Sequence, residues 1–166
     1  AVGGLTPVVA IYSSFLQRAI DQMLHDVCMQ KLHVVFAVDR AGLVGNDGET
    51  HQGCFDLSYL SMMPHMQVLA PMDGEELEKM FAYAMEAAGP VTIRYPRGTA
   101  LYGIHHAQPQ IHEGEAEILR LGEKTAFLAV GNMVETALEA ADLLKEEGEA
   151  ATVVNMRFVK PFDTGM

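Results

Sequence analysis

The chain has 166 residues, 49% of them hydrophobic and 20% charged, a composition typical of a globular protein that buries a core. Its formal net charge of −11 argues against nucleic-acid binding, because nucleic-acid-binding domains usually carry a basic face. No apolar run approaches the length of a membrane span, and Cys28 and Cys54 lack metal-like spacing. We therefore expect a cytoplasmic protein without nucleic-acid or membrane partners, in which Cys28 is a buried thiol.

The first hundred residues alternate between apolar runs and helical stripes. Four short runs predict strands buried on both faces, at residues 8–12, 33–38, 66–70 and 91–95. Apolar residues spaced by three and four predict the intervening helices, at residues 13–27, 56–63 and 73–88. Ser13 or Ser14 is expected to cap the first helix, and Asp73 the third, with Glu76 at the capping-box position.

This alternation predicts an α/β fold, an open and mainly parallel sheet with helices on both faces. Such sheets bind ligands at the carboxyl ends of their strands. Tyr12, Arg40 and Arg97 all stand at or just past such ends, so we expect polar groups to converge on one edge of the sheet.

A second unit follows a segment without periodicity. We expect residues 1–98 to form the first domain, residues 99–114 a linker, and residues 115–166 the beginning of a second α/β domain. Strands are predicted at residues 116–121, 125–130 and 151–158, with a helix capped by Asn132 before the last of them. Adjacent histidines in the linker, His105 and His106, are expected to be exposed rather than metal ligands.

The most informative stretch is the glycine-rich loop at residues 39–56, DRAGLVGNDGETHQGCFD. Loops of this length inside compact domains are usually functional or disordered, and the apolar residues interleaved here argue against disorder. Asp47 and His51 are candidates for proton transfer or for hydrogen bonding to a substrate. A turn at Asp47 and an ordinary surface histidine at position 51 are the alternatives.

Other candidates stand next to strand ends. Phe15 and Arg18 share a helix face that could stack a flat ring and hold an anion, although Phe15 in the core and a solvated Arg18 fit the pattern too. Arg40 and Arg97 could hold a phosphate or carboxylate, whereas Arg94 lies within a strand and is expected to be structural. The sequence has no dinucleotide fingerprint, P-loop or nucleophile elbow, and predicts no metal site.

Several of these stretches together resemble one known family. YSSFLQRAIDQ, FAVDRAGLVGNDGETHQGCFDLSYL, QVLAPMDGEEL and VTIRYPRG resemble the pyrimidine-binding domain of the 1-deoxy-D-xylulose-5-phosphate synthase family, a transketolase-like group. VGNMVETALEAADLL and VVNMRFVKPFD resemble the start of its C-terminal domain.

The resemblance implies a thiamine-diphosphate-dependent transferase that condenses pyruvate with glyceraldehyde 3-phosphate and releases carbon dioxide. It implies that Phe15 stacks on the aminopyrimidine ring of the cofactor, and that four residues line the site: Tyr12, Arg18, Asp47 and His51. It further implies that Arg40 and Arg97 hold the phosphate of the acceptor. The product would supply isoprenoid, thiamine and pyridoxal synthesis.

The resemblance also implies parts outside this sequence. In the family a glutamate just before the first strand protonates the aminopyrimidine, and another domain holds Mg²⁺ and the diphosphate. We therefore expect a fragment that is inactive alone, from a parent that is a homodimer. A transketolase or a 2-oxoacid dehydrogenase β-type component is the alternative enzyme, and a non-catalytic binding or assembly domain is the alternative outside catalysis.

Overall fold

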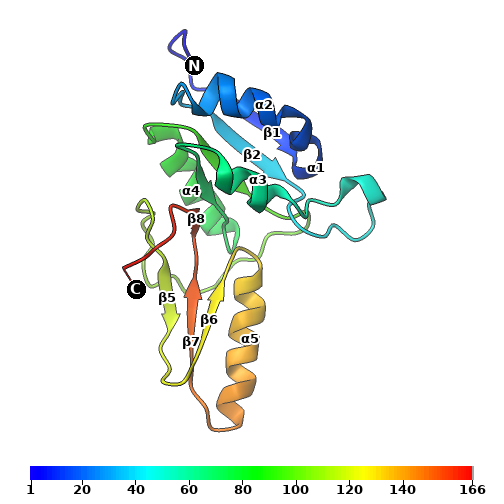
Figure 1. Cartoon of the computed structure of the whole chain (residues 1–166). Coiled ribbons are helices and arrows are strands. Elements are labelled where there is room, and N and C mark those ends of the chain that lie inside the picture. The colour runs from blue at the N-terminus through cyan, green and yellow to red at the C-terminus, as the bar shows by residue number, and fades with distance from the viewer. Residues whose placement is uncertain (166) are drawn as a thin grey trace.

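The computed structural model describes residues 1–165, which form two stacked units (Figure 1). The first unit is built on a five-stranded sheet with the order β1-β2-β4-β3-β8. Its strands are β1 (Val8–Tyr12), β2 (Val35–Asp39), β4 (Val91–Arg94), β3 (Gln67–Leu69) and β8 (Phe158–Lys160). The first four are parallel, as predicted, whereas β8 runs antiparallel to β3.

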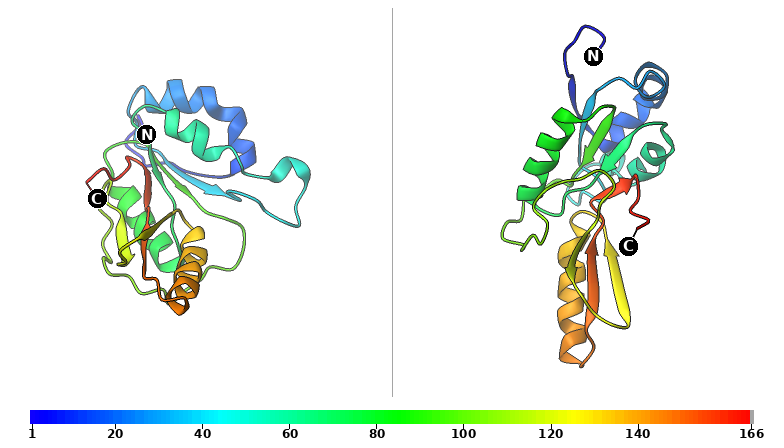
Figure 2. Two further views of the ribbon diagram at one scale, coloured as in Figure 1. Left: turned by 60° about the horizontal axis from the view of Figure 1, so that its bottom comes forward. Right: turned by 90° about the vertical axis from the view of Figure 1, so that its left-hand side faces the viewer.

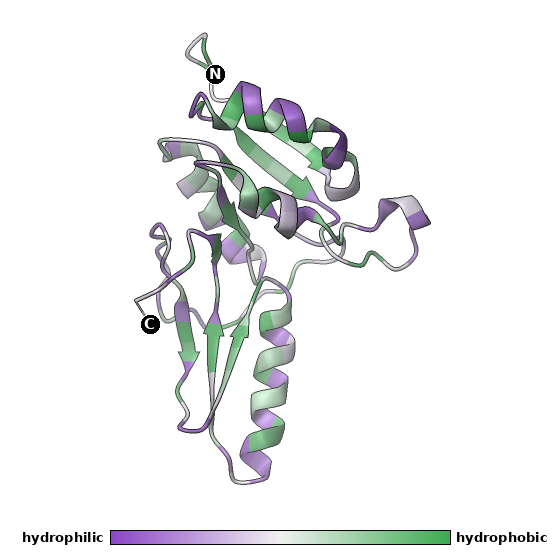
Figure 3. Ribbon diagram, in the orientation of Figure 1, coloured by the Kyte–Doolittle hydropathy of each residue, from purple (hydrophilic) through white to green (hydrophobic). Residues whose placement is uncertain are grey.

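Helices cover both faces of this sheet, which confirms the predicted fold class (Figure 2). One face packs against α3 (Asp56–Met62) and the helical segment after β1, through Leu16, Met23 and Leu60. The other face packs against α4 (Gly74–Glu86), through Met80 and Ala84. Apolar residues follow the strands, while polar residues gather at the tip of the projecting loop (Figure 3). Cys28 is fully buried in the first of these cores.

The segment after β1 is helical but not one regular helix. It consists of α1 (Ser13–Leu16), a 3₁₀ turn (Gln17–Ala19), α2 (Ile20–Gln22) and a π-helix (Met23–Cys28). An apolar stripe at spacings of three and four predicts helical backbone but not its type, because all three helix types keep such residues on roughly one side. The predicted serine cap is wrong, since Tyr12 takes the N-cap position and neither serine hydroxyl has a hydrogen-bond partner.

The cap of α4 is confirmed, but its capping-box partner has a different role. The Asp73 carboxylate accepts a hydrogen bond of 2.8 Å from the Glu76 amide. The Glu76 side chain does not return to Asp73, but binds the Met72 amide at 2.7 Å and the Arg157 guanidinium at 2.6 Å. Glu76 therefore joins the start of α4 to the end of the chain.

The second unit is a three-stranded sheet with one helix. Its order is β5-β7-β6, from β5 (Glu117–Arg120), β7 (Ala151–Asn155) and β6 (Thr125–Ala129), and α5 (Met133–Glu146) packs against it. Asn132 occupies the N-cap position of α5, as predicted, but its side chain makes no capping hydrogen bond. The amides of Met133 and Val134 bond to the carbonyls of Val130 and Gly131. None of the helices described for residues 1–165 is long and apolar enough to cross a membrane.

The predicted strand at residues 151–158 is split between the two sheets. β7 ends at Asn155, and β8 pairs with β3 of the first unit, so the chain returns to the first sheet after crossing the second. Residues 99–114 contain no helix or strand. The expectation that His106 is exposed is wrong. Its side chain is only 5% accessible, and its Nε2 lies 3.1 Å from Asp73 Oδ2.

Candidate active site

The glycine-rich loop projects from the carboxyl end of β2 (Figure 1). Gly42 and Gly53 close its base through two backbone hydrogen bonds of 2.8 Å. A Cβ atom at position 53 would lie 2.2 Å from the Arg40 carbonyl oxygen and 2.6 Å from Ser13 Oγ, so only glycine fits there. The loop is thus held at its base in a defined position beside the start of α1.

Three rings meet where the loop faces β1 and α1. The rings of Tyr12 and Phe15 stack with centroids 5.2 Å apart, and His51 approaches Phe15 edge-on at 5.1 Å. The Arg18 guanidinium lies 5.6 Å from the Phe15 centroid. Both Tyr12 and Phe15 remain partly exposed, and Arg18 is exposed. The structure therefore brings together four residues that the sequence placed in one site.

Asp47 links the polar part of the loop. Its Oδ2 lies 3.0 Å from Arg40 Nε and 3.6 Å from an Arg97 nitrogen, and its Oδ1 lies 4.0 Å from His51 Nδ1. The Gly48 amide and then the Arg40 guanidinium donate to this carboxylate, and both lower the pKa of Asp47. Asp47 is therefore an anion that orients two arginines and the histidine.

The two arginines assigned to a phosphate differ in their surroundings. Arg40 also binds Asp39 at 2.7 Å, and its guanidinium carbon lies 3.7 Å from the Tyr12 ring centroid. Arg97 has a side chain that is 49% accessible, and within residues 1–165 its one ion pair is the 3.6 Å contact with Asp47. An incoming anion would therefore reach Arg97 more readily than Arg40, whose side chain is only 17% accessible and already contacts two carboxylates.

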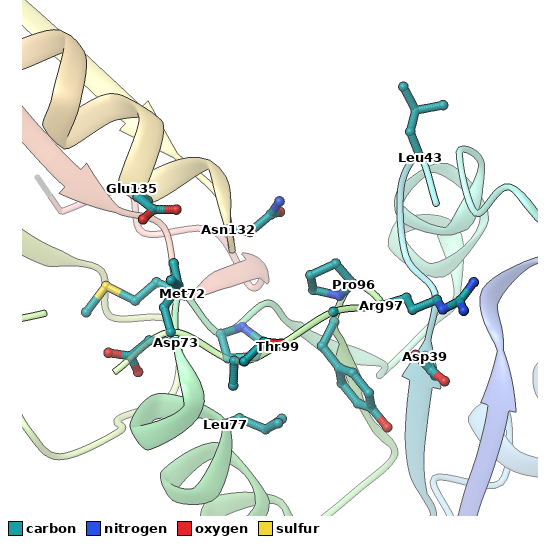
Figure 4. Close-up of a pocket in the computed structure, with 15 residues that line it drawn as sticks. Asp39, Leu43, Met72, Asp73, Leu77, Pro96, Arg97, Thr99, Asn132 and Glu135 are labelled. Atoms are coloured by element: carbon teal, nitrogen blue, oxygen red, sulfur yellow. The ribbon is translucent and has the colours of Figure 1, made fainter. Parts of the chain in front are cut away.

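A cavity of about 640 Å³ extends from this polar cluster toward the second unit (Figure 4). Asp39 and Arg97 line one side, and Asn132 and Glu135 at the start of α5 line the other. Sequence reasoning missed the residues from α5, because their place at the cavity depends on how the two units pack. Tyr12, Phe15 and His51 are not among the lining residues, so the cavity adjoins the ring cluster without containing it.

Among residues 1–165, one group of side chains has the spacing of metal ligands, namely Glu76, His106 and Glu117. Both carboxylates are already bound by Arg157, each at 2.6 Å. The guanidinium thus occupies the place that a cation would need, and we interpret the group as a buried ion cluster that joins the units. These residues do not fit the Mg²⁺ that the resemblance implies.

Two further buried contacts fix α3 below the loop. Arg94 forms an ion pair with Asp56, with Nε 3.1 Å from Oδ2. Tyr59 donates to the Ser13 carbonyl at 3.1 Å, and burial, together with the charge of Asp56, raises the pKa of Tyr59. Arg94 lies in a central buried strand, and a buried charge needs an oppositely charged partner. This position in the sequence therefore indicated a buried acidic partner, which is Asp56.

Comparison with known families agrees with this arrangement. Residues 1–101 match the family described as "Transketolase, pyrimidine binding domain". The chain belongs to the transketolase family. Residues 114–166 match the family's C-terminal domain, described as "Transketolase, C-terminal domain".

Two similar curated proteins carry the same name. The chain is 53% identical over 166 residues to the 1-deoxy-D-xylulose-5-phosphate synthase of Lachnoclostridium phytofermentans, covering 100% of this chain and 27% of that protein. It is 56% identical over 164 residues to the synthase of Syntrophus aciditrophicus, covering 98% of this chain and 25% of the relative. The chain therefore spans about a quarter of the length of these relatives.

Solved transketolase structures share the fold. "Split gene transketolase, inactive beta4 tetramer" superposes with a TM-score of 0.88 at 32% identity, covering 98% of this chain and 52% of that one. A transketolase from Campylobacter jejuni gives a TM-score of 0.79 at 24% identity, covering 98% of this chain and 26% of the other. The second likeness concerns the fold alone.

Proposed function

We propose that this chain is part of a thiamine-diphosphate-dependent synthase that condenses pyruvate with glyceraldehyde 3-phosphate, giving 1-deoxy-D-xylulose 5-phosphate and carbon dioxide. The observation that carries the proposal is the convergence of the Tyr12–Phe15–His51 rings with the Asp47-centred arginines at the carboxyl edge of a parallel sheet. The names of relatives more than 50% identical over the chain support it.

The ring cluster fits the cofactor. A partly exposed aromatic pair next to the Arg18 guanidinium suits a flat, polar ring that stacks on Phe15. Thiamine diphosphate, when bound, supplies the carbon nucleophile that joins the two substrates. The contribution of Tyr12, Phe15 and Arg18 is to fix the plane and the outer edge of its pyrimidine ring.

The loop residues act on the substrates. The Nδ1 atom of His51 lies 3.2 Å from Thr50 Oγ1 and faces Asp47, which leaves Nε2 to hydrogen-bond a substrate oxygen or to move its proton. Arg97 would hold the phosphate of the acceptor with Arg40 nearby, because both guanidinium groups contact the same carboxylate oxygen of Asp47.

The rest of the machinery would lie outside these residues. We propose that Mg²⁺ and the diphosphate are held by another domain of a longer chain, that the whole enzyme is a cytoplasmic homodimer, and that residues 1–166 alone have no turnover. Domain boundaries near residues 98 and 115 belong to the same proposal, and the absence of helix and strand between residues 99 and 114 supports them.

The test uses the purified full-length protein with thiamine diphosphate and Mg²⁺. Pyruvate labelled with ¹³C at its carboxyl carbon and glyceraldehyde 3-phosphate should give labelled carbon dioxide and a five-carbon deoxyketose phosphate, detected by mass spectrometry. Turnover of a ketose phosphate donor in place of pyruvate would instead indicate a transketolase. Pyruvate decarboxylation without the five-carbon product would favour a 2-oxoacid dehydrogenase component, and no turnover with any donor would favour a binding domain.

A further inference from the structure

A buried ion pair lies beneath the site without belonging to it. Arg94, the last residue of β4, and Asp56, the first residue of α3, meet through two contacts, Nε–Oδ2 at 3.1 Å and Nη2–Oδ1 at 3.4 Å. Their side chains are only 10% and 2% accessible. Neither side chain lines the cavity, so the pair acts on a substrate only through the segments that it joins.

One of those segments is the loop that carries Asp47 and His51, and the other carries Arg97. Asp56 stands three residues after Gly53, which closes the loop that bears Asp47 and His51. Arg94 stands three residues before Arg97 on the segment that leaves β4. A two-point contact between a planar guanidinium and a carboxylate fixes both distance and angle, which a single hydrogen bond does not.

Neighbouring backbone contacts hold the other side of the same junction. The Ala41 amide donates to the Tyr95 carbonyl at 3.0 Å, next to Arg40 and one residue after Arg94. This bond places the start of the loop against the segment after β4. The Asp56–Arg94 pair places the end of the loop against the same segment, so the loop is held at both of its ends.

We propose that Asp56 and Arg94 are positioning residues that set the distance between His51 and Arg97, and thereby align the phosphorylated acceptor. This inference rests on the proposed function of the site. A displacement of about 1 Å in such an arrangement can lower a rate by about 100-fold, although no atom of the pair touches the substrate.

The closing experiment compares variants of the full-length protein. Arg94→Met or Asp56→Asn alone leaves a buried group unpaired and lowers stability whatever the role of the pair. The double variant Asp56→Asn/Arg94→Met removes both charges, and its midpoint of unfolding should return close to that of the wild type. Its kcat/KM for glyceraldehyde 3-phosphate should remain reduced by about 10-fold to 100-fold, because the alignment is still lost.

Two further variants serve as a partial rescue and as a control. Arg94→Lys keeps the charge but not the two-point contact, and should recover part of the lost kcat/KM. The matched control is Asp142→Asn/Arg120→Met, which removes an exposed Arg–Asp pair on the second unit and should leave kinetics unchanged. If the double variant at positions 56 and 94 regained both stability and full kcat/KM, the pair would be structural only and the proposal would be wrong.

A second readout separates this proposal from the proposed function. Absence of product with the wild type would overturn the proposed function, without bearing on the pair. Hydrogen exchange then tests the positioning role without any turnover. In Asp56→Asn/Arg94→Met the amides of Gly42 and Gly53 should exchange at least about 10-fold faster than in the wild type, while the amides of Val35–Asp39 stay protected. Unchanged exchange at both glycines would overturn the positioning role.

Discussion

The guanidinium of Arg40 stacks on the ring of Tyr12, with its central carbon 3.7 Å from the ring centroid. Arg40 adopts a left-handed backbone conformation, with φ of 57°, which is uncommon for a residue other than glycine. Its contacts with Tyr12, Asp39 and Asp47 support this conformation and tie the loop to β1. The predictions below concern the site that these contacts hold together.

The charge of Asp47 should make the loop sensitive to acid. The Gly48 amide and Arg40 lower the pKa of Asp47 in the folded protein below its unfolded value of about 3.9. The ionised Asp47 therefore stabilises the fold fully above the unfolded pKa, and this stabilisation is lost as the pH falls through the folded pKa. The stability difference between wild type and Asp47→Asn should therefore be constant from pH 7 to pH 5 and shrink below about pH 4. Urea unfolding of the full-length proteins measures it, and a difference that grows on acidification would contradict the assignment.

Substitution of His51 should impair turnover far more than stability. His51→Ala removes a partly exposed ring that contacts Phe15 edge-on, so the melting temperature should change little. The value of kcat should fall by about 100-fold or more, the usual effect of losing a group that moves a proton. His25→Ala, on an exposed histidine of the helical segment after β1, is the matched control and should leave kcat unchanged. Equal activity of the two variants would place His51 outside the reaction.

Substitution of Arg97 should weaken acceptor binding selectively. Arg97→Ala should raise the KM for glyceraldehyde 3-phosphate by about 10-fold or more, because a charge-assisted contact to phosphate is lost, while the KM for pyruvate changes little. The selectivity for glyceraldehyde 3-phosphate over unphosphorylated glyceraldehyde should fall by the same factor. Arg120→Ala on the second unit is the control. An unchanged KM for the phosphorylated acceptor would remove Arg97 from the phosphate site.

Adding one methyl group at Gly53 should distort the site. In Gly53→Ala the new Cβ would meet the Arg40 carbonyl at 2.2 Å, so the backbone must move. We expect a loss of about 1–3 kcal/mol in unfolding free energy and a marked fall in kcat/KM. Gly3→Ala is the control, because no atom lies within 4 Å of its Cβ position. Full activity of Gly53→Ala would show that the loop base tolerates movement.

Much of the first unit could be predicted from sequence because its strands and helices are local features. The apolar runs and the Asp73 cap depend on neighbours in the chain, and the structure confirms them. The mixed helix types after β1 were not predictable, because residue spacing does not distinguish them.

Long-range contacts account for the rest. Burial of His106 requires Asp73 and Glu117, which approach it from both units. The pairing of β8 with β3, and the place of Asn132 at the cavity, likewise depend on segments that are distant in sequence. At the candidate site, residues at strand ends were found because the rule for parallel sheets is general. Asp39, which holds Arg40, and the Asp56–Arg94 pair beneath the site were not assigned a role there from sequence.

The return of β8 to the first sheet has a consequence for biosynthesis. The edge of β3 stays unpaired until residues 158–160 have emerged from the ribosome, and Lys160 can bond to the carbonyls of Ser61 and Met63 only then. A nascent chain would therefore carry an open strand edge while residues 70–157 are translated, a state that favours aggregation or chaperone binding. The two units are consequently interdependent during synthesis, and a stop before residue 158 would leave the first of them incomplete.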